Sequence, residues 1–113
     1  MNATKPLRYG QDWTREESIL AFDLYCRIPF RKTKPNNPDV IALAELLHRS
    51  PGSVARKLGN FGAFDPKLAE QDISGLTHTS VLDEQVWNEF HSDWERMVTE
   101  AESLRTKFVA KLP

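Results

Sequence analysis

The sequence WTREESILAFDLYCRI, residues 13–28, has the pattern of an amphipathic helix and decides the fold class. Thr14 followed three residues later by Glu17 is a capping box, in which each side chain binds the backbone amide of the other residue. A proline directly after the segment ends the helical run. We therefore predict a helix over residues 15–28. Its apolar face recurs at helical spacing through Leu20, Leu24 and Ile28.

Two further helices are predicted from a shared start signal, a capping residue followed by proline. Asn37-Pro38 starts a helix over residues 38–47, and Ser50-Pro51 starts one over residues 51–60. Because only three residues separate them, these helices must cross sharply, as in a helix-turn-helix. With the basic, irregular loop of residues 29–37, they complete a three-helix unit over residues 13–61.

The rest of the chain is predicted as a connector over residues 62–82, with a short helix near Pro66, and a long helix in the segment 83–113. This long helix should run from about residue 83 to residue 111. Apolar residues follow coiled-coil spacing along it. The part up to Trp94 should pack on the three-helix unit, and the later part should meet a missing domain, a partner or a second copy. That seam comprises Met97, Ala101, Leu104 and Phe108.

Composition favours one folded all-α domain of 113 residues, preceded by a tail over residues 1–12. No apolar run has the length of a membrane span or signal peptide, so we expect a cytoplasmic protein without membrane contact. The single Cys26 is expected to be buried in its helix. Charge is asymmetric: residues 1–60 carry a net +4 and residues 61–113 a net −5, which predicts different partners for the two halves.

The basic half points to double-stranded DNA as the partner. Helical spacing places Ser53, Arg56, Lys57 and Asn60 on the outer side of the third helix. Cations there and on the basic loop could reach phosphates or guanine edges, and hydroxyl and amide groups could bind base edges. The alternative is a solvated face without a ligand. The candidate DNA-binding residues are Arg31, Lys32, Lys34, Arg49, Ser50, Ser53, Arg56, Lys57 and Asn60.

The joint pattern of WTREE, an apolar second helix and RSPGSVARKL resembles a Myb/SANT-like three-helix unit. The strings WTREESILAFDLYCRIPF, NPDVIALAELLHRSPGSVARKLGNF and LDEQVWNEFHSDWE also resemble the N-terminal helical domain of bacterial HNH restriction endonucleases, including 5-methylcytosine-specific ones. This resemblance implies a DNA-reading module that delivers a nuclease module in cis. It also implies sensitivity to methylated or hydroxymethylated cytosine.

We expect no catalytic centre, metal site or cofactor in the chain itself. An HNH nuclease needs a general-base histidine and metal ligands on a ββα hairpin, whereas His48, His78 and His91 fall in a turn, a loop and a helix. The alternative function, from another class, is a protein-protein interaction or dimerisation module that acts through the long C-terminal helix.

Overall fold

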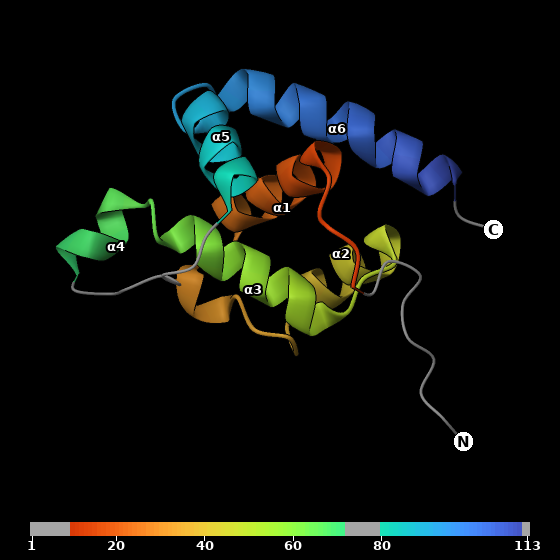
Figure 1. The fold of residues 1–113 in the computed structure, drawn as a ribbon, viewed down its shortest axis with the longest axis horizontal. Coiled ribbons are helices and arrows are strands. Elements are labelled where there is room, and N and C mark those ends of the chain that lie inside the picture. Colours follow the sequence, from red (N-terminus) through yellow and green to blue (C-terminus); the bar gives the residue numbers. More distant parts are fainter. Residues whose placement is uncertain (1–9, 72–79, 112–113) are drawn as a thin grey trace.

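The part of the chain that the structure describes is built from helices alone. The computed structural model describes residues 10–71 and 80–111. His78 and the rest of residues 72–79 in the predicted connector lie outside the described residues. No strand occurs among those described, which confirms the predicted all-α fold (Figure 1). In chain order the elements are α1 (Arg15–Arg27), the 3-10 helix η1 (Phe30–Lys32), α2 (Pro38–Leu47), α3 (Pro51–Gly62), α4 (Pro66–Glu70), α5 (Val81–Phe90) and α6 (Trp94–Ala110).

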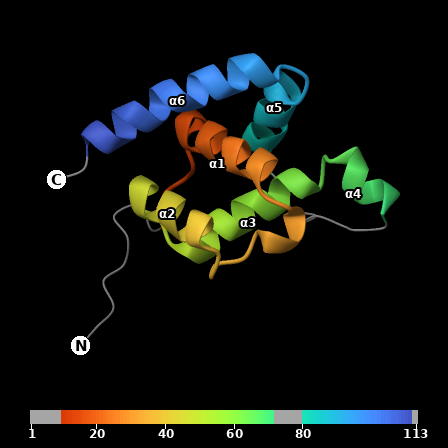
Figure 2. The ribbon, with the colours of Figure 1, turned by 180° about the vertical axis from the view of Figure 1, so that it is seen from behind.

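The first helix, α1, lies at the centre of the fold. Residues 17–23 are all buried, because α2, α3, α5 and α6 pack around this helix (Figures 1 and 2). The buried run includes two carboxylates, Glu17 and Asp23. A buried charge is tolerated only when it is paired and hydrogen-bonded, and both have cationic partners: Glu17 binds Arg49, and Asp23 binds Arg27 and Arg105.

The helices α2 and α3 form the predicted helix-turn-helix. Each starts with the predicted cap, because the side chains of Asn37 and Ser50 accept hydrogen bonds from backbone amides of the first turn. The chain reverses at His48, whose φ of 56° and ψ of 43° place it in the left-handed region. The observed bounds of α2 match the prediction, and α3 continues to Gly62, two residues beyond its predicted end.

The prediction of one long helix over residues 83–111 is wrong, because two helices occupy this segment. Asp93 interrupts it with a non-helical backbone (φ −137°, ψ 68°), and its side chain accepts a hydrogen bond from the amide of Arg96 at 3.4 Å. This makes Asp93 the N-cap of a new helix. The chain turns a corner between α5 and α6, and α6 runs back across α1 (Figure 1).

The predicted seam for a partner or second copy is also wrong, because it is used within the chain. Met97, Ala101 and Phe108 are buried in the core, and Leu104 packs against it. The corner before α6 explains this difference, since it folds the apolar face of α6 onto α1 instead of directing it away from the domain. A homodimer through these four residues is therefore not available to the folded chain.

Two side chains lie on the surface although the sequence predicted them to be buried. Trp94 is 52% exposed because it is the first residue of α6, at the corner. Trp87 packs as expected, edge-to-face on Phe22 with 5.5 Å between the ring centroids. Cys26 is exposed on the last turn of α1. None of the described helices combines the length and apolar character needed to cross a membrane.

Candidate nucleic-acid interface

Arg49, a predicted DNA contact, is instead bound inside the protein. Its guanidinium donates two hydrogen bonds to the Glu17 carboxylate, from Nε and Nη2, each at 2.9 Å. It donates two more, also at 2.9 Å, to the backbone carbonyls of Gln11 and Asp12. The Arg49 side chain is only 4% exposed. The prediction for this residue is therefore wrong: the buried Glu17 needs a counter-charge, and Arg49 supplies it.

Lys57 and Asn60 were predicted to point outward from α3, and this is also wrong. The Lys57 ammonium lies 2.5 Å from one oxygen of Asp83, and the Asn60 amide donates to the other oxygen at 2.9 Å. All three residues are buried. Asp83 also closes the capping box of α5 with Ser80, so the start of α5 is bound to the outer side of α3.

Trp13 lies between these two ion pairs. Its ring has the Arg49 guanidinium at 4.7 Å and the Lys57 ammonium at 5.0 Å from the centroid, which is cation–π geometry. Its indole N–H donates to the Ser53 hydroxyl at 3.2 Å. Ser50 accepts from the Ser53 amide as the N-cap of α3. Both predicted serine contacts thus have intramolecular bonds, and both residues are only partly exposed.

Four of the predicted cations remain on the surface. They are exposed, and none forms an ion pair within residues 10–71 and 80–111. No Asp or Glu occurs in residues 24–38 or in residues 46–64, so their own segments carry no acidic neighbour. We call these four residues the basic set: Arg31, Lys32, Lys34 and Arg56.

The basic loop is attached to α3 at its start. A Cβ atom built on Gly62 would lie 2.5 Å from the Phe30 ring, so the glycine is what allows the ring to approach the helix. Further along, the Thr33 hydroxyl donates to the Phe30 carbonyl at 2.6 Å, and the Asn37 amide donates to the Lys32 carbonyl at 2.9 Å. This loop, predicted to be irregular, thus contains η1, and its backbone runs beside the helix-turn-helix (Figure 2).

The basic set has the chemistry of an anion-binding surface. Arginine and lysine side chains that lack acidic partners are free to bind phosphate oxygens, and arginine can also bind the edge of guanine. Only Arg56 comes from α3, so most of the set lies on the loop and not on the helix that would enter a groove. Geometry of this kind favours contacts to the nucleic-acid backbone over contacts to bases.

The structure also reveals two site residues that the sequence did not indicate. They are the buried acids that pair with Arg49 and Lys57. Glu17 and Asp83 each occupy the third helical position of a capping box, and each binds a cation on or next to α3. The Ser80–Asp83 spacing was the available signal for the second box, and it was hidden by the expectation that the helix starts near residue 83.

Comparison of the chain with family models, with curated proteins and with solved structures found no match. The evidence for its function therefore comes from its own sequence and geometry.

Proposed function

We propose that this chain binds double-stranded DNA through the basic set, mainly by contacts to phosphates. The observation that carries the proposal is that Arg31, Lys32, Lys34 and Arg56 are exposed and unpaired in the described structure, in segments without a single acid. The chain as a whole has a net charge of −1, whereas residues 24–38 and 46–64 carry basic residues and no acid. Local positive charge is what a polyanion recognises.

The proposal differs from the expectation of a base-reading third helix. Because Arg49, Lys57 and Asn60 hold internal acids, we exclude them from the DNA-binding surface. Arg56 is the one predicted cation on α3 that is exposed, so it is our candidate for a groove contact. The three loop cations would then fix the position of the domain on the backbone.

We further propose that the domain serves an HNH-type, modification-dependent restriction endonuclease as its DNA-binding module. The support is the sequence resemblance over residues 13–95, together with a helix-turn-helix placed in the first part of that range. On this view the nuclease is a separate module in cis. Recognition of methylated or hydroxymethylated cytosine is part of the proposal and rests on the resemblance alone.

The direct test is fluorescence anisotropy with labelled duplexes that carry cytosine, 5-methylcytosine or 5-hydroxymethylcytosine at matched positions. We expect binding at low ionic strength that weakens with salt, with a slope of log K against log salt of about −0.9 for each phosphate contacted. Absence of binding to all three duplexes at low salt would refute the proposal. Equal affinity for the three would refute only the part that concerns modified bases.

Variants locate the surface. Arg31→Ala with Lys34→Ala should reduce the salt slope by up to about 1.8, because two phosphate contacts are lost. The matched control, Lys107→Ala with Lys111→Ala, removes two exposed cations of the C-terminal region and should leave the slope unchanged. If both double variants reduce binding equally, the site lies outside the basic set. Lys57→Ala should instead lower stability, because it leaves Asp83 buried without its cation.

A further inference from the structure

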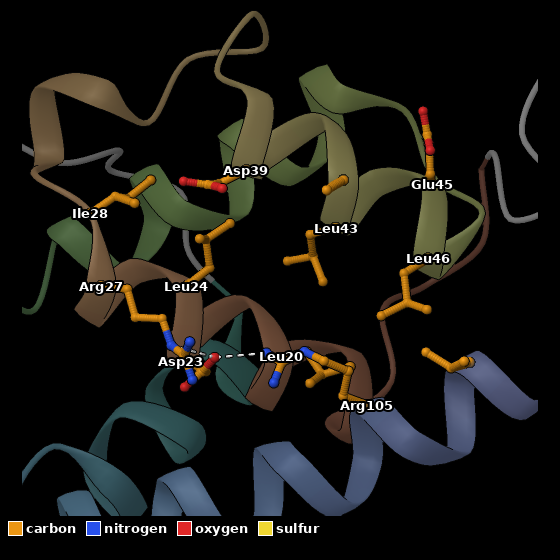
Figure 3. A pocket seen from close by; sticks show the side chains of 12 residues that line it. Leu20, Asp23, Leu24, Arg27, Ile28, Asp39, Leu43, Glu45, Leu46 and Arg105 are labelled. Carbon is orange, nitrogen blue, oxygen red and sulfur yellow. Dashed lines mark hydrogen bonds and ion pairs between the residues drawn. The ribbon is translucent and has the colours of Figure 1, made fainter.

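A groove lies between α1, α2 and α6, and no residue of the basic set lines it. It has a volume of about 770 Å³ and is lined by side chains of all three helices (Figure 3). Its surface is largely aliphatic, and several of the lining side chains are only partly covered by the protein. The apolar lining residues are Leu20, Leu24, Ile28, Ala42, Leu43, Leu46 and Val109, of which Leu20 and Leu43 are buried.

The two sides of the groove carry opposite charges. On one side, the buried Asp23 binds two guanidinium groups, Nε of Arg27 at 3.0 Å and Nη2 of Arg105 at 2.9 Å. One carboxylate therefore holds two cations, which leaves this side net positive. On the α2 side, Asp39 is exposed and has no ion pair in the described part of the chain, whereas the Glu45 side chain points away from the groove (Figure 3).

We propose that this groove binds one amphipathic helix of a partner protein or partner domain. An apolar stripe would fill the aliphatic floor, a basic flank would face Asp39, and an acidic flank would face Arg27 and Arg105. Asp39, Leu43 and Leu46 are four and seven residues apart on α2, so they share the face of this helix that lines the groove. This is the helix-in-groove mode of recognition, with anchors at i, i+4 and i+7.

A second copy of this chain is a poorer fit to the groove. The exposed large apolar residues among those described are Val81, Trp94 and Val109, and they lie at separate helix ends instead of forming a stripe. The outward positions of α6 are mostly polar, including Glu95, Thr99 and Glu102. The described helices thus offer no outward apolar face that matches the floor, which favours a helix of another protein as the occupant.

The test uses two designed helical peptides of identical composition. Both carry leucines at i, i+4, i+7 and i+11. The first has lysines along one flank and glutamates along the other, and the second has the same charges mixed on both flanks. Binding of each fluorescent peptide to the full chain is measured by anisotropy. We expect the segregated peptide to bind at least tenfold more tightly than the mixed one, and equal affinities or no binding would overturn the proposal.

Protein variants tie the binding to the groove. Val109→Glu places a charge on its floor and should abolish binding, whereas the matched control, Val81→Glu, changes an exposed valine far from the groove and should not affect it. Asp39→Asn should reduce the preference for the segregated peptide, because it removes the negative charge on the α2 side of the groove. Sedimentation is run in parallel. If the wild-type chain self-associates and the Val109→Glu variant does not, the groove binds a second copy of the chain and the proposal is overturned.

Discussion

Replacing Glu17 by glutamine should strongly destabilise the domain, because it removes one charge of a buried ion pair. Glu17 is 0% exposed and accepts two hydrogen bonds from Arg49, each at 2.9 Å. A hydrogen bond to a charged group contributes about 1.5–3 kcal/mol, and loss of one partner from a buried pair costs about 3–5 kcal/mol. Glutamine keeps one oxygen acceptor, so we expect a loss of about 3 kcal/mol, at the lower end of that range.

The measurement is urea unfolding followed by far-UV circular dichroism, with thermal unfolding as a second probe. A loss of this size should lower Tm by about 12 °C, at about 4 °C for each kcal/mol in a chain of this length. The control is Glu16→Gln, which removes the same charge one residue away on the exposed side of α1. It should change the free energy of unfolding by less than about 0.5 kcal/mol.

A double-mutant cycle decides whether the pair itself is responsible. Arg49→Met leaves Glu17 buried without its cation, whereas Glu17→Gln with Arg49→Met removes both charges together. The double variant should therefore cost at least about 1 kcal/mol less than the sum of the single variants. Additive costs, or a Glu17→Gln variant as stable as Glu16→Gln, would refute the conclusion that this ion pair holds α1 to the helix-turn-helix.

Three other predictions concern pH, packing and thiol chemistry. Hydrogen bonds from Arg15, with help from Arg96, lower the pKa of Glu89 from 4.5 to about 2, so the stability it provides is complete above pH 4.5 and lost as the pH falls toward 2. Urea melts over this range should show a flatter pH dependence for Glu89→Gln. Gly62→Ala should destabilise the domain by about 1–3 kcal/mol in the same melts, because the new methyl group displaces Phe30. Gly52→Ala is the control, because a methyl group there meets open space. It should be neutral or stabilising by up to about 1 kcal/mol. Partial burial of the Cys26 thiol, and then the nearby charges of Asp23 and Asp65, raise its pKa to about 11, although the residue reaches the surface. Its alkylation at pH 8, followed by mass spectrometry, should therefore be slower in the folded chain than in urea, and equal rates would contradict this.

Much of the fold could be predicted because helix starts are encoded locally. Thr14, Asn37, Ser50 and Asp65 each cap the helix that their sequence context predicted. The break before α6 had a local signal too, in Asp93, but the regular apolar spacing on either side of it favoured a continuous helix. Apolar periodicity reports which face of a helix is buried, and it does not report whether the chain turns between two helices that share the pattern.

The candidate site was harder to predict, because its electrostatics depend on residues far away in the sequence. Arg49 lies 32 residues from Glu17, and Lys57 lies 26 residues from Asp83. Helical spacing alone placed Lys57 on the outer side of α3, and nothing local indicates that an acid at the start of α5 covers it. Only the loop cations and Arg56, for which the fold supplies no acid, kept the exposure that their sequence pattern predicted.

The two capping-box carboxylates also bear on how the domain unfolds. Glu17 begins the buried run of α1 and Asp83 belongs to the first turn of α5, and both are neutralised from α3 or the turn before it. In a partly folded form without α3, each would have to return to water or stay desolvated without a cation, at a cost of several kcal/mol. We therefore expect partial structures that keep α1 and α5 packed while α3 is detached to be sparsely populated. On this view the three helices open in a single cooperative event.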